Sequence, residues 1–203
     1  MSNEFFRHGI LFVVSAPSGA GKTTLCDALR QTPDFVYSVS CTTRASRPGE
    51  IPGEDYYFLS EEEFERRVRA GDFLEHASVH GARYGTLRET VLGNLAAGVD
   101  VLIDIDTQGA TMIRNSTAGL IQDVLADVFI MPSHLDELRR RLIKRGTETP
   151  AQIEQRLLRA SEEMERWRDY RYTIISGSVE EDLGKFRAIM RAERYLSKRL
   201  VLK

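Results

Sequence analysis

The chain has 203 residues, 42% of them hydrophobic and 29% charged, and a formal net charge of -2. This composition is typical of one globular domain, and the charge argues against a general binder of nucleic acid or membrane surfaces. No apolar run approaches the roughly 18 residues that a membrane span requires. Cys26 and Cys41 have neither metal-ligand nor C-x-x-C spacing, so we expect free thiols and a cytoplasmic protein.

The first half of the chain predicts short strands and helices that alternate. The apolar run ILFVVS at 10–15 predicts a strand buried on both faces of a parallel sheet, and KTTLCDALRQ after it predicts a helix. Further strands are expected at 35–40, 55–60 and 73–80, with a turn at 81–86. Two capping boxes precede helices that end at glycines: Ser60 with Glu63 and Gly71, and Thr86 with Glu89 and Gly98.

The second half contains the longest apolar strands and a basic helix. Strands are expected at 99–106, 124–132 and 171–176. Ser133 is predicted to cap the basic helix that precedes Gly146, and Thr149 to Gln152 reads as a capping box for a helix that ends near Trp167. A closing amphipathic helix begins near residue 179.

This order of elements predicts an α/β fold. Strands that alternate with helices favour a mainly parallel sheet flanked by helices, as in P-loop NTPases. The 41–86 stretch breaks the alternation with short strands and turns. We therefore expect it to be an insertion with a small mixed β-sheet of its own.

The segment APSGAGKT at 16–23, between the first buried strand and the helix, nearly matches the P-loop pattern G-x-x-x-x-G-K-[ST]. Ala16 replaces the first glycine, whereas Gly21, Lys22 and Thr23 are in register. Glycines let backbone N–H groups surround a phosphate, and the following helix presents its positive N-terminal end to the same anion. The lysine adds a positive charge, and the threonine hydroxyl can ligate Mg²⁺. The alternative is a plain glycine turn. We expect ATP to bind at Ala16, Pro17, Ser18, Gly19, Ala20, Gly21, Lys22, Thr23 and Thr24.

A second anion site is indicated by CTTRASRPGE at 41–50. Arg44 and Arg47 lie three residues apart in an extended or turning loop, where their planar guanidinium groups can flank one phosphate. Tyr56 and Tyr84 stand beside glycine-bearing turns and can add hydroxyl donors. A kinase for nucleoside monophosphates needs such a site opposite its phosphate loop, whereas a GTPase or motor uses water as the acceptor.

The motifs SVSCTTRASRPGE, GEDYYF, FLEHA, RYGT, DIDTQG and RGTET follow the phosphate loop in this order. In this combination, which covers nearly the whole chain, the sequence resembles the bacterial guanylate kinase family. The resemblance implies Mg²⁺-assisted transfer of the γ-phosphoryl group of ATP to GMP. It implies GMP binding by Ser40, Arg44, Arg47, Tyr56, Glu75, Tyr84 and Thr86.

The chemistry of guanine suits a carboxylate at position 75. Guanine presents a ring N–H next to an exocyclic amine, and the carboxylate of Glu75 can accept from both, whereas adenine has a lone pair in place of the ring N–H. Sites with such polar complementarity can favour one base over another by a factor of about 10⁴ or more in kcat/KM. Taken alone, Glu75 would be assigned to the solvated face of a half-exposed strand.

Asp104 and Asp106 end an apolar strand and share one face by the two-residue period. Acids at this edge of a parallel sheet face the usual ligand crevice. Either can orient Mg²⁺ through water, bind GMP or hold an arginine, and a simple strand-end cap is the alternative. We include Asp104 among the GMP-binding candidates.

The basic helix and the helix after it supply candidate lid arginines. The resemblance selects Arg141, Arg145 and Arg156, which together with Lys22 and Arg44 form the expected catalytic set. Arginines of this kind stabilise charge on the transferred phosphoryl group. The sequence departs from the family at Ser176, which takes the place of an asparagine near the adenine and leaves the preference for ATP open.

The resemblance predicts one domain over 1–203. Its core is expected at about 1–39, 87–132 and 171–203, its GMP-binding insertion at about 40–86 and its lid at about 133–170. The expected partners are GMP and ATP, with no nucleic acid and no membrane, and a homo-oligomer is left open. The main alternative is a non-catalytic guanylate-kinase-like module that binds proteins. A P-loop GTPase should carry N-K-x-D, which the chain lacks.

Overall fold

A five-stranded parallel sheet forms the centre of the computed structural model, which describes residues 5–17, 19–79, 81–116, 119–146 and 149–202. The strands lie in the order β10-β9-β2-β8-β3, and every neighbouring pair is parallel. They are β2 (Leu11–Ser15), β3 (Val36–Tyr37), β8 (Val101–Asp104), β9 (Leu125–Met131) and β10 (Tyr172–Ile175). The expected α/β class with a parallel sheet is therefore confirmed.

Helices cover both faces of this sheet, because successive side chains of β2 point to opposite faces and pack on different helices. Leu11 and Val13 pack into one core with α3, α4 and α5, while Phe12 and Val14 pack into another with α1 and α8. All four side chains are fully buried, which explains the uninterrupted apolar run. The helices are α1 (Lys22–Arg30), α3 (Arg88–Ala96), α4 (Thr107–Arg114), α5 (Gly119–Val124) and α8 (Val179–Arg194).

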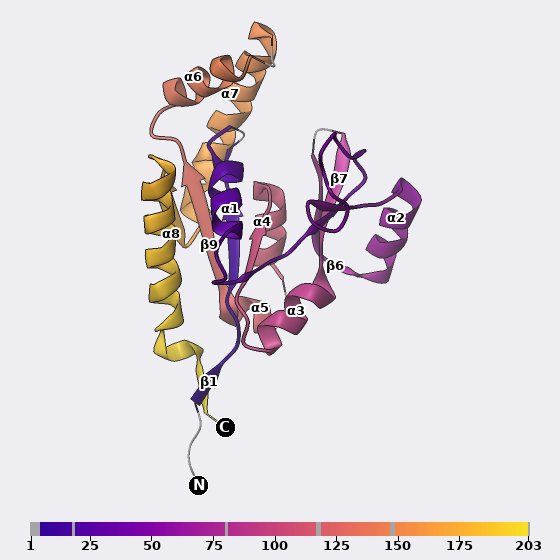
Figure 1. Cartoon of the computed structure of the whole chain (residues 1–203), viewed down its shortest axis with the longest axis vertical. Helices are drawn as coiled ribbons and strands as arrows, with labels where there is room; N and C mark the ends of the chain where they lie inside the picture. The colour runs from indigo at the N-terminus through magenta and orange to yellow at the C-terminus, as the bar shows by residue number, and fades with distance from the viewer. Residues whose placement is uncertain (1–4, 18, 80, 117–118, 147–148, 203) are drawn as a thin grey trace.

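A second, four-stranded sheet stands to one side of the first (Figure 1) and has the order β5-β4-β7-β6. It is mixed, because β4 pairs with β5 in parallel, whereas the β4–β7 and β6–β7 pairs are antiparallel. Phe64 of the covering helix α2 packs on Cys41 and Phe73. The elements are β4 (Ser40–Thr42), β5 (Tyr56–Phe58), α2 (Glu61–Ala70), β6 (Phe73–Val79) and β7 (Ala82–Leu87). The expected insertion with a mixed sheet is confirmed.

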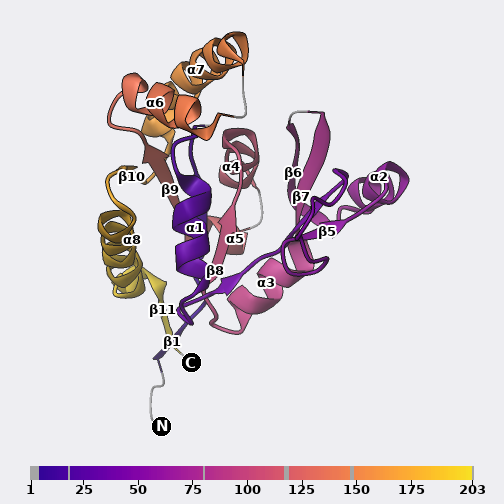
Figure 2. The same cartoon turned by 45° about the horizontal axis from the view of Figure 1, so that its top comes forward.

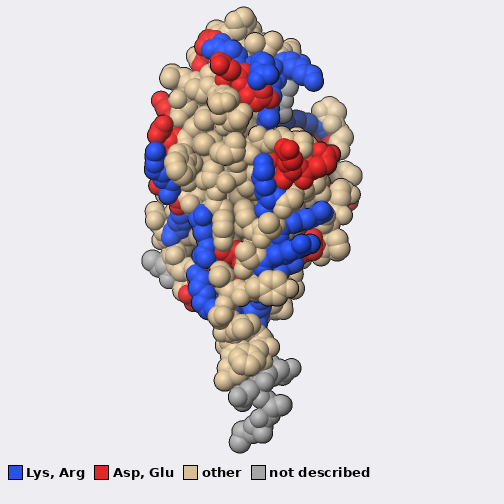
Figure 3. All heavy atoms as spheres, turned by 90° about the vertical axis from the view of Figure 1, so that its left-hand side faces the viewer, with Lys and Arg blue, Asp and Glu red and all other residues tan. Residues whose placement is uncertain are grey.

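The helices α6 (Leu135–Arg145) and α7 (Pro150–Met164) pack on each other beside the N-terminal end of α1 (Figure 2). Their small core consists of Leu138, Leu142, Ile153, Leu157 and Ala160. A 3₁₀ turn at Glu165–Asp169 leads from α7 to β10. On the face that carries α8, basic and acidic side chains are interspersed (Figure 3), in keeping with the small net charge.

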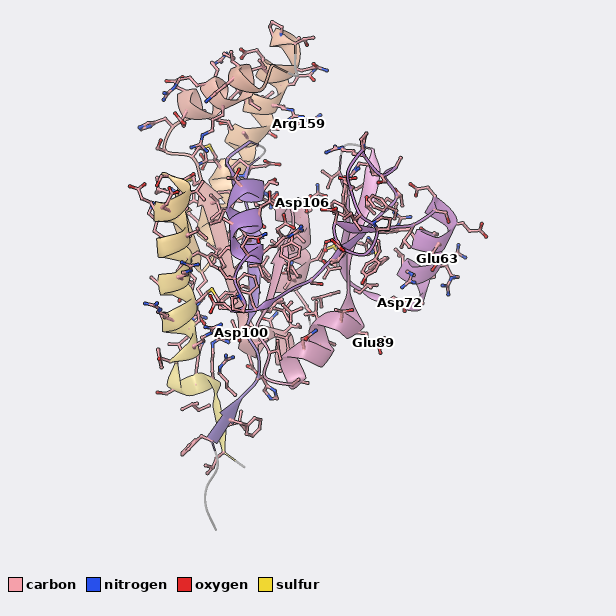
Figure 4. The ribbon with its side chains drawn as sticks, in the orientation of Figure 1. Glu63, Asp72, Glu89, Asp100, Asp106 and Arg159 are labelled. Atoms are coloured by element: carbon pink, nitrogen blue, oxygen red, sulfur yellow. The ribbon has the colours of Figure 1, made fainter. Side chains whose placement is uncertain are left out.

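Both ends of the described chain meet away from these helices (Figure 1). Strand β1 (Phe5–Arg7) pairs antiparallel with β11 (Leu200–Leu202), which follows a 3₁₀ turn at Ser197–Arg199. Buried Asp100 accepts hydrogen bonds from Arg7 at 2.6 Å and from Arg194 at 2.7 Å, and lies at the opposite end of strand β8 from Asp106 (Figure 4). None of the helices in the described ranges is long and apolar enough to cross a membrane.

The structure corrects several predicted elements. The stretch 81–86 is not a turn, because only Gly81 lies in the left-handed region and Ala82 begins β7. Gly85 suggested a loop, but it lies over the Phe73 ring, which a Cβ at this position would meet at 2.8 Å. The strand expected at 35–40 is divided, since β3 ends at Tyr37 and β4 of the second sheet begins at Ser40.

The predicted helix caps are partly right. Ser60 and Thr149 accept from the backbone N–H groups three residues on, and Gly71 ends α2 in the left-handed region. The prediction for Thr86 is wrong, since its hydroxyl donates to Glu75 and α3 begins after Leu87 without a side-chain cap. His134, not Ser133, occupies the N-cap position of α6. Helices α4 and α5 were not expected at all.

Candidate active site

A cavity of about 660 Å³ lies where the phosphate loop, the end of β8, the small sheet and the α6–α7 pair meet. A site of this size can hold small-molecule ligands. The predicted site residues that line it are Ala16, Pro17, Gly19, Gly21, Lys22, Thr23, Thr24, Ser40, Arg47, Tyr56, Glu75, Tyr84, Asp104, Asp106, Arg141 and Arg156. Residues from the predicted ATP and GMP sites therefore face one shared space.

The phosphate loop takes a shape that requires glycine at two positions. Gly19 has φ 87° and Gly21 has φ 102°, and Gly21 is the N-cap residue of α1. This left-handed backbone is unfavourable for other residues. The first residues of α1, Lys22 to Thr24, line the cavity, where the positive N-terminal end of the helix favours an anion. Ala20 is buried and does not line the cavity, and Ser18 lies outside the described residues.

Lys22 is held by the end of β8. Its Nζ donates to the carbonyl of Ile105 at 3.1 Å and lies 3.8 Å from Oδ2 of Asp104. The other oxygen of Asp104 accepts a hydrogen bond from the Tyr37 hydroxyl, and burial raises the pKa of Tyr37. Asp104 therefore balances the lysine charge and is oriented by a tyrosine that the sequence analysis did not single out.

Asp106 begins α4 and lies between the phosphate-loop end of α1 and the small sheet (Figure 4). Its Oδ1 accepts from the backbone N–H of Gly109 at 2.8 Å, so it is the N-cap of this helix. Asp106 is thus placed beyond strand β8 rather than in it, although it lines the same cavity as Asp104.

Glu75 is a buried carboxylate of the site, with 3% of its surface exposed. The Thr86 hydroxyl donates to its Oε1 at 2.6 Å. Burial raises the pKa of Glu75 to about 7, and the nearby charge of Asp106 adds to this, while the bond from Thr86 opposes it. A half-exposed, solvated Glu75 is therefore excluded. Thr86 is fully buried and reaches the cavity only through Glu75.

The two loop arginines differ in position. Arg47 lines the cavity together with Ser40, Tyr56 and Tyr84. Arg44 is not among the residues that line it, although its guanidinium lies 5.2 Å from the ring of Tyr56, which does. Its guanidinium forms two hydrogen bonds, of 2.8 and 2.9 Å, with the carboxylate of Glu50. These bonds lower the pKa of Glu50 to about 2.

The helix pair contributes arginines from the opposite side. Arg141 donates to the carbonyl of Ala20 at 3.0 Å and to Glu137 at 2.9 Å. Leu138 packs so closely on Gly19 that a Cβ there would lie 2.7 Å from it. The pair therefore rests directly on the phosphate loop. Arg156 lines the cavity, and for Arg145 the structure describes the backbone in α6 but not the side chain.

The donor set of the cavity fits Mg²⁺. The hydroxyl-bearing Thr23 and the carboxylates of Asp104 and Asp106 all line it. No cluster of three or more His, Cys, Asp or Glu side chains suited to a metal occurs in the described ranges. Mg²⁺ keeps several waters and is usually held by one or two carboxylates plus substrate phosphates, so it does not require such a cluster.

In the wall of the cavity beside β10, Ser176 was expected near the adenine, whereas no sequence motif marks Gly177 and Asp182. Ser176, Gly177 and Asp182 line the cavity next to the phosphate loop. Ser176 donates to Asp182 at 3.0 Å, and so does the backbone N–H of Gly177. Asp182 is buried on α8, where the helical pattern alone did not distinguish it from the surface acids around it.

Comparison with known proteins agrees with this geometry. A family model described as guanylate kinase matches residues 9–193. A guanylate kinase from Symbiobacterium thermophilum is 44% identical over 187 residues, which are 92% of this chain and 86% of the relative. One from Novosphingobium aromaticivorans is 45% identical over 192 residues, 93% of this chain and 84% of the relative. The crystal structure of guanylate kinase from Anaplasma phagocytophilum has a TM-score of 0.81 at 35% identity and covers 98% of this chain and 93% of that chain. The chain belongs to the guanylate kinase family.

Proposed function

We propose that this chain transfers the γ-phosphoryl group of ATP to GMP, which yields ADP and GDP. The observation that carries the proposal is the shared cavity, which has the phosphate loop of Lys22 on one wall and the buried carboxylate of Glu75 on another. A donor triphosphate and an acceptor monophosphate can thus meet without a covalent intermediate on the protein. Family membership supports the same reaction.

In the proposed acceptor site, Glu75 accepts from the ring N–H and the amine of guanine, while the Thr86 hydroxyl donates to its Oε1. Arg47, Tyr56, Tyr84 and Ser40 bind the rest of GMP from the cavity wall, and Asp104 lies near enough to take part. Arg44 exchanges Glu50 for the GMP phosphate. The exchange should change the electrostatic energy of Arg44 little, because its guanidinium has an anionic partner both before and after GMP binds.

In the proposed donor site, the N–H groups of the loop and Lys22 bind the ATP phosphates. Mg²⁺, when bound through Thr23 and through water on Asp104 or Asp106, supplies charge neutralisation between the phosphates. Arg141 and Arg156 face the same space, and together with Arg145 they are proposed to stabilise the transferred phosphoryl group. The acceptor phosphate is already ionised, so the reaction needs positioning and electrostatic stabilisation more than a general base.

The division of the chain also stays a proposal. We assign the core to about 1–39, 87–132 and 171–203, the GMP-binding insertion to about 40–86 and the lid to about 133–170. Closure of the lid would exclude water from the cavity and limit ATP hydrolysis. We further propose that the protein works in the cytoplasm on GMP and ATP as free small molecules, without a nucleic-acid partner.

A non-catalytic protein-binding module is the less favoured function. Such a module has no need for the left-handed glycines of a phosphate loop, for Lys22 at its end, or for a buried Glu75. All of these are present around one cavity, and the closely similar relatives carry the name of the enzyme.

A coupled assay of ADP release tests the proposal. The purified chain is given ATP, Mg²⁺ and, in parallel, GMP, AMP, CMP or UMP. We expect turnover with GMP and very little with the other three, since only guanine offers two adjacent donors to Glu75. Absence of GMP-dependent ADP release would refute the proposed function, and equal rates with AMP would refute the role of Glu75.

A further inference from the structure

Gly109 lies in the first turn of α4 directly behind Glu75. It is buried, and its N–H is bonded to the capping carboxylate of Asp106 at 2.8 Å. A Cβ built at this position would lie 2.5 Å from Oε2 of Glu75 and 3.1 Å from its Cδ. A Cβ contact below 3.0 Å forces a neighbouring atom to shift, so a side chain here requires the Glu75 carboxylate to move from its present position.

The backbone does not explain the glycine. Gly109 is not among the glycines with positive φ, so alanine can adopt its conformation. Glycine is also less favourable than alanine inside a helix. The residue is therefore unfavourable for α4 itself. The Glu75 carboxylate is the tightest contact that a Cβ would meet, and Cδ1 of Ile105 follows at 3.3 Å.

Glu75 has little freedom to move away. Its Oε1 is bonded to the fully buried hydroxyl of Thr86 at 2.6 Å, and only 3% of Glu75 is exposed. A methyl group on residue 109 would have to push Oε2 by about 0.9 Å or more, from 2.5 Å to at least 3.4 Å, to reach an ordinary contact distance. That shift would rotate the plane of the carboxylate, in which its two oxygens accept hydrogen bonds.

We propose that Gly109 is a positioning residue that determines acceptor specificity through Glu75. By leaving space for Oε2, it lets the carboxylate face an acceptor base that carries a ring N–H beside an exocyclic amine. Asp106 supports this arrangement, because its bond to the Gly109 N–H fixes the first turn of α4. The inference rests on the proposed function, since it assigns the base-reading geometry of that same site.

The test compares Gly109→Ala with Gly93→Ala. Gly93 lies in helix α3 with open space around its position, so it matches the gain in helix propensity without a contact. For Gly109→Ala we expect kcat/KM for GMP to fall about tenfold or more, mainly through KM, since a misplacement of 1 Å can cost about 10²-fold. The KM for ATP should stay at the wild-type value, and Gly93→Ala should leave both unchanged.

A double substitution keeps the proposal testable if Gly109→Ala folds poorly. In a Glu75→Ala background the carboxylate is absent, so Gly109→Ala should no longer lower the urea midpoint of unfolding. A loss of stability that is equal with and without Glu75, or an unchanged KM for GMP in a folded Gly109→Ala protein, would overturn the inference. These results are distinct from failure of the proposed function, in which the wild-type chain itself would not turn over GMP.

Discussion

The replacement of Glu75 by glutamine should change how the free energy of unfolding depends on pH. Burial raises the pKa of Glu75 from 4.5 to about 7 in the folded chain, so the folded state holds this proton more tightly than the unfolded state does. The contribution of protonated Glu75 to the free energy of unfolding is therefore fully present below pH 4.5. It is lost as the pH rises through about 7. Glutamine keeps the shape and an oxygen that can accept from Thr86, but it does not titrate.

The size of the effect follows from the shift. One pKa unit corresponds to about 1.36 kcal/mol, so ionising Glu75 in the empty protein costs roughly 3 kcal/mol. Part of this loss has already occurred at pH 5, where most unfolded chains are ionised at this residue. Between pH 5 and pH 8.5, we expect the Glu75→Gln chain to gain roughly 2–3 kcal/mol relative to the wild type.

Urea denaturation at pH 5, 6, 7 and 8.5 measures this difference. Glu63→Gln is the control, because hydrogen bonds from Arg66 and Arg67 lower the pKa of Glu63 to about 2. Both its folded and its unfolded pKa lie below the measured range, so its difference from the wild type should be constant. A constant difference for Glu75→Gln as well would refute the claim that Glu75 is a desolvated carboxylate in the free protein.

Three further substitutions follow from the same structure. Lys22→Ala should lower transfer by about 10²-fold or more while calorimetry finds GMP affinity nearly unchanged; a parallel loss of GMP affinity would contradict separate donor and acceptor sites. Thr149→Ala should lower the free energy of unfolding in urea by about 1 kcal/mol, since Thr149 caps α7. Thr149→Ser should retain most of that stability, and equal losses for the two variants would argue against the cap. Tyr37→Phe should lower stability by about 1 kcal/mol, because Asp104 loses a hydroxyl donor, and an unchanged urea midpoint would show that this bond does not contribute.

The main sheet could be predicted because its signals are local. Continuous apolar runs bounded by glycine, proline or acids mark strands that are buried on both faces, and β2 has this pattern throughout. The phosphate loop is equally local, since the left-handed Gly19 and Gly21 shape the backbone of their own segment. Helix α4 was missed because it follows the strand without a loop, and its cap Asp106 was interpreted as a candidate ligand.

The features that could not be predicted depend on partners far away in the sequence. Gly85 resembles a turn residue until the Phe73 ring beneath it is known. The position of Arg44 depends on Glu50, which the loop sequence contains but whose geometry it does not specify. Asp182 and Tyr37 reach the site through contacts that no motif records.

The antiparallel pair of β1 with β11 has a practical consequence for engineering. Because Phe5 stands opposite Leu202, a short peptide could join the two ends, and new ends could be opened at an exposed loop elsewhere. Fluorescent labels or affinity handles joined beyond β1 or β11 would be attached away from the phosphate-loop end of α1 (Figure 1). Trimming Leu200–Leu202, by contrast, would remove the only ladder partner that β1 has in the described chain, whereas the Arg7–Asp100 ion pair would remain.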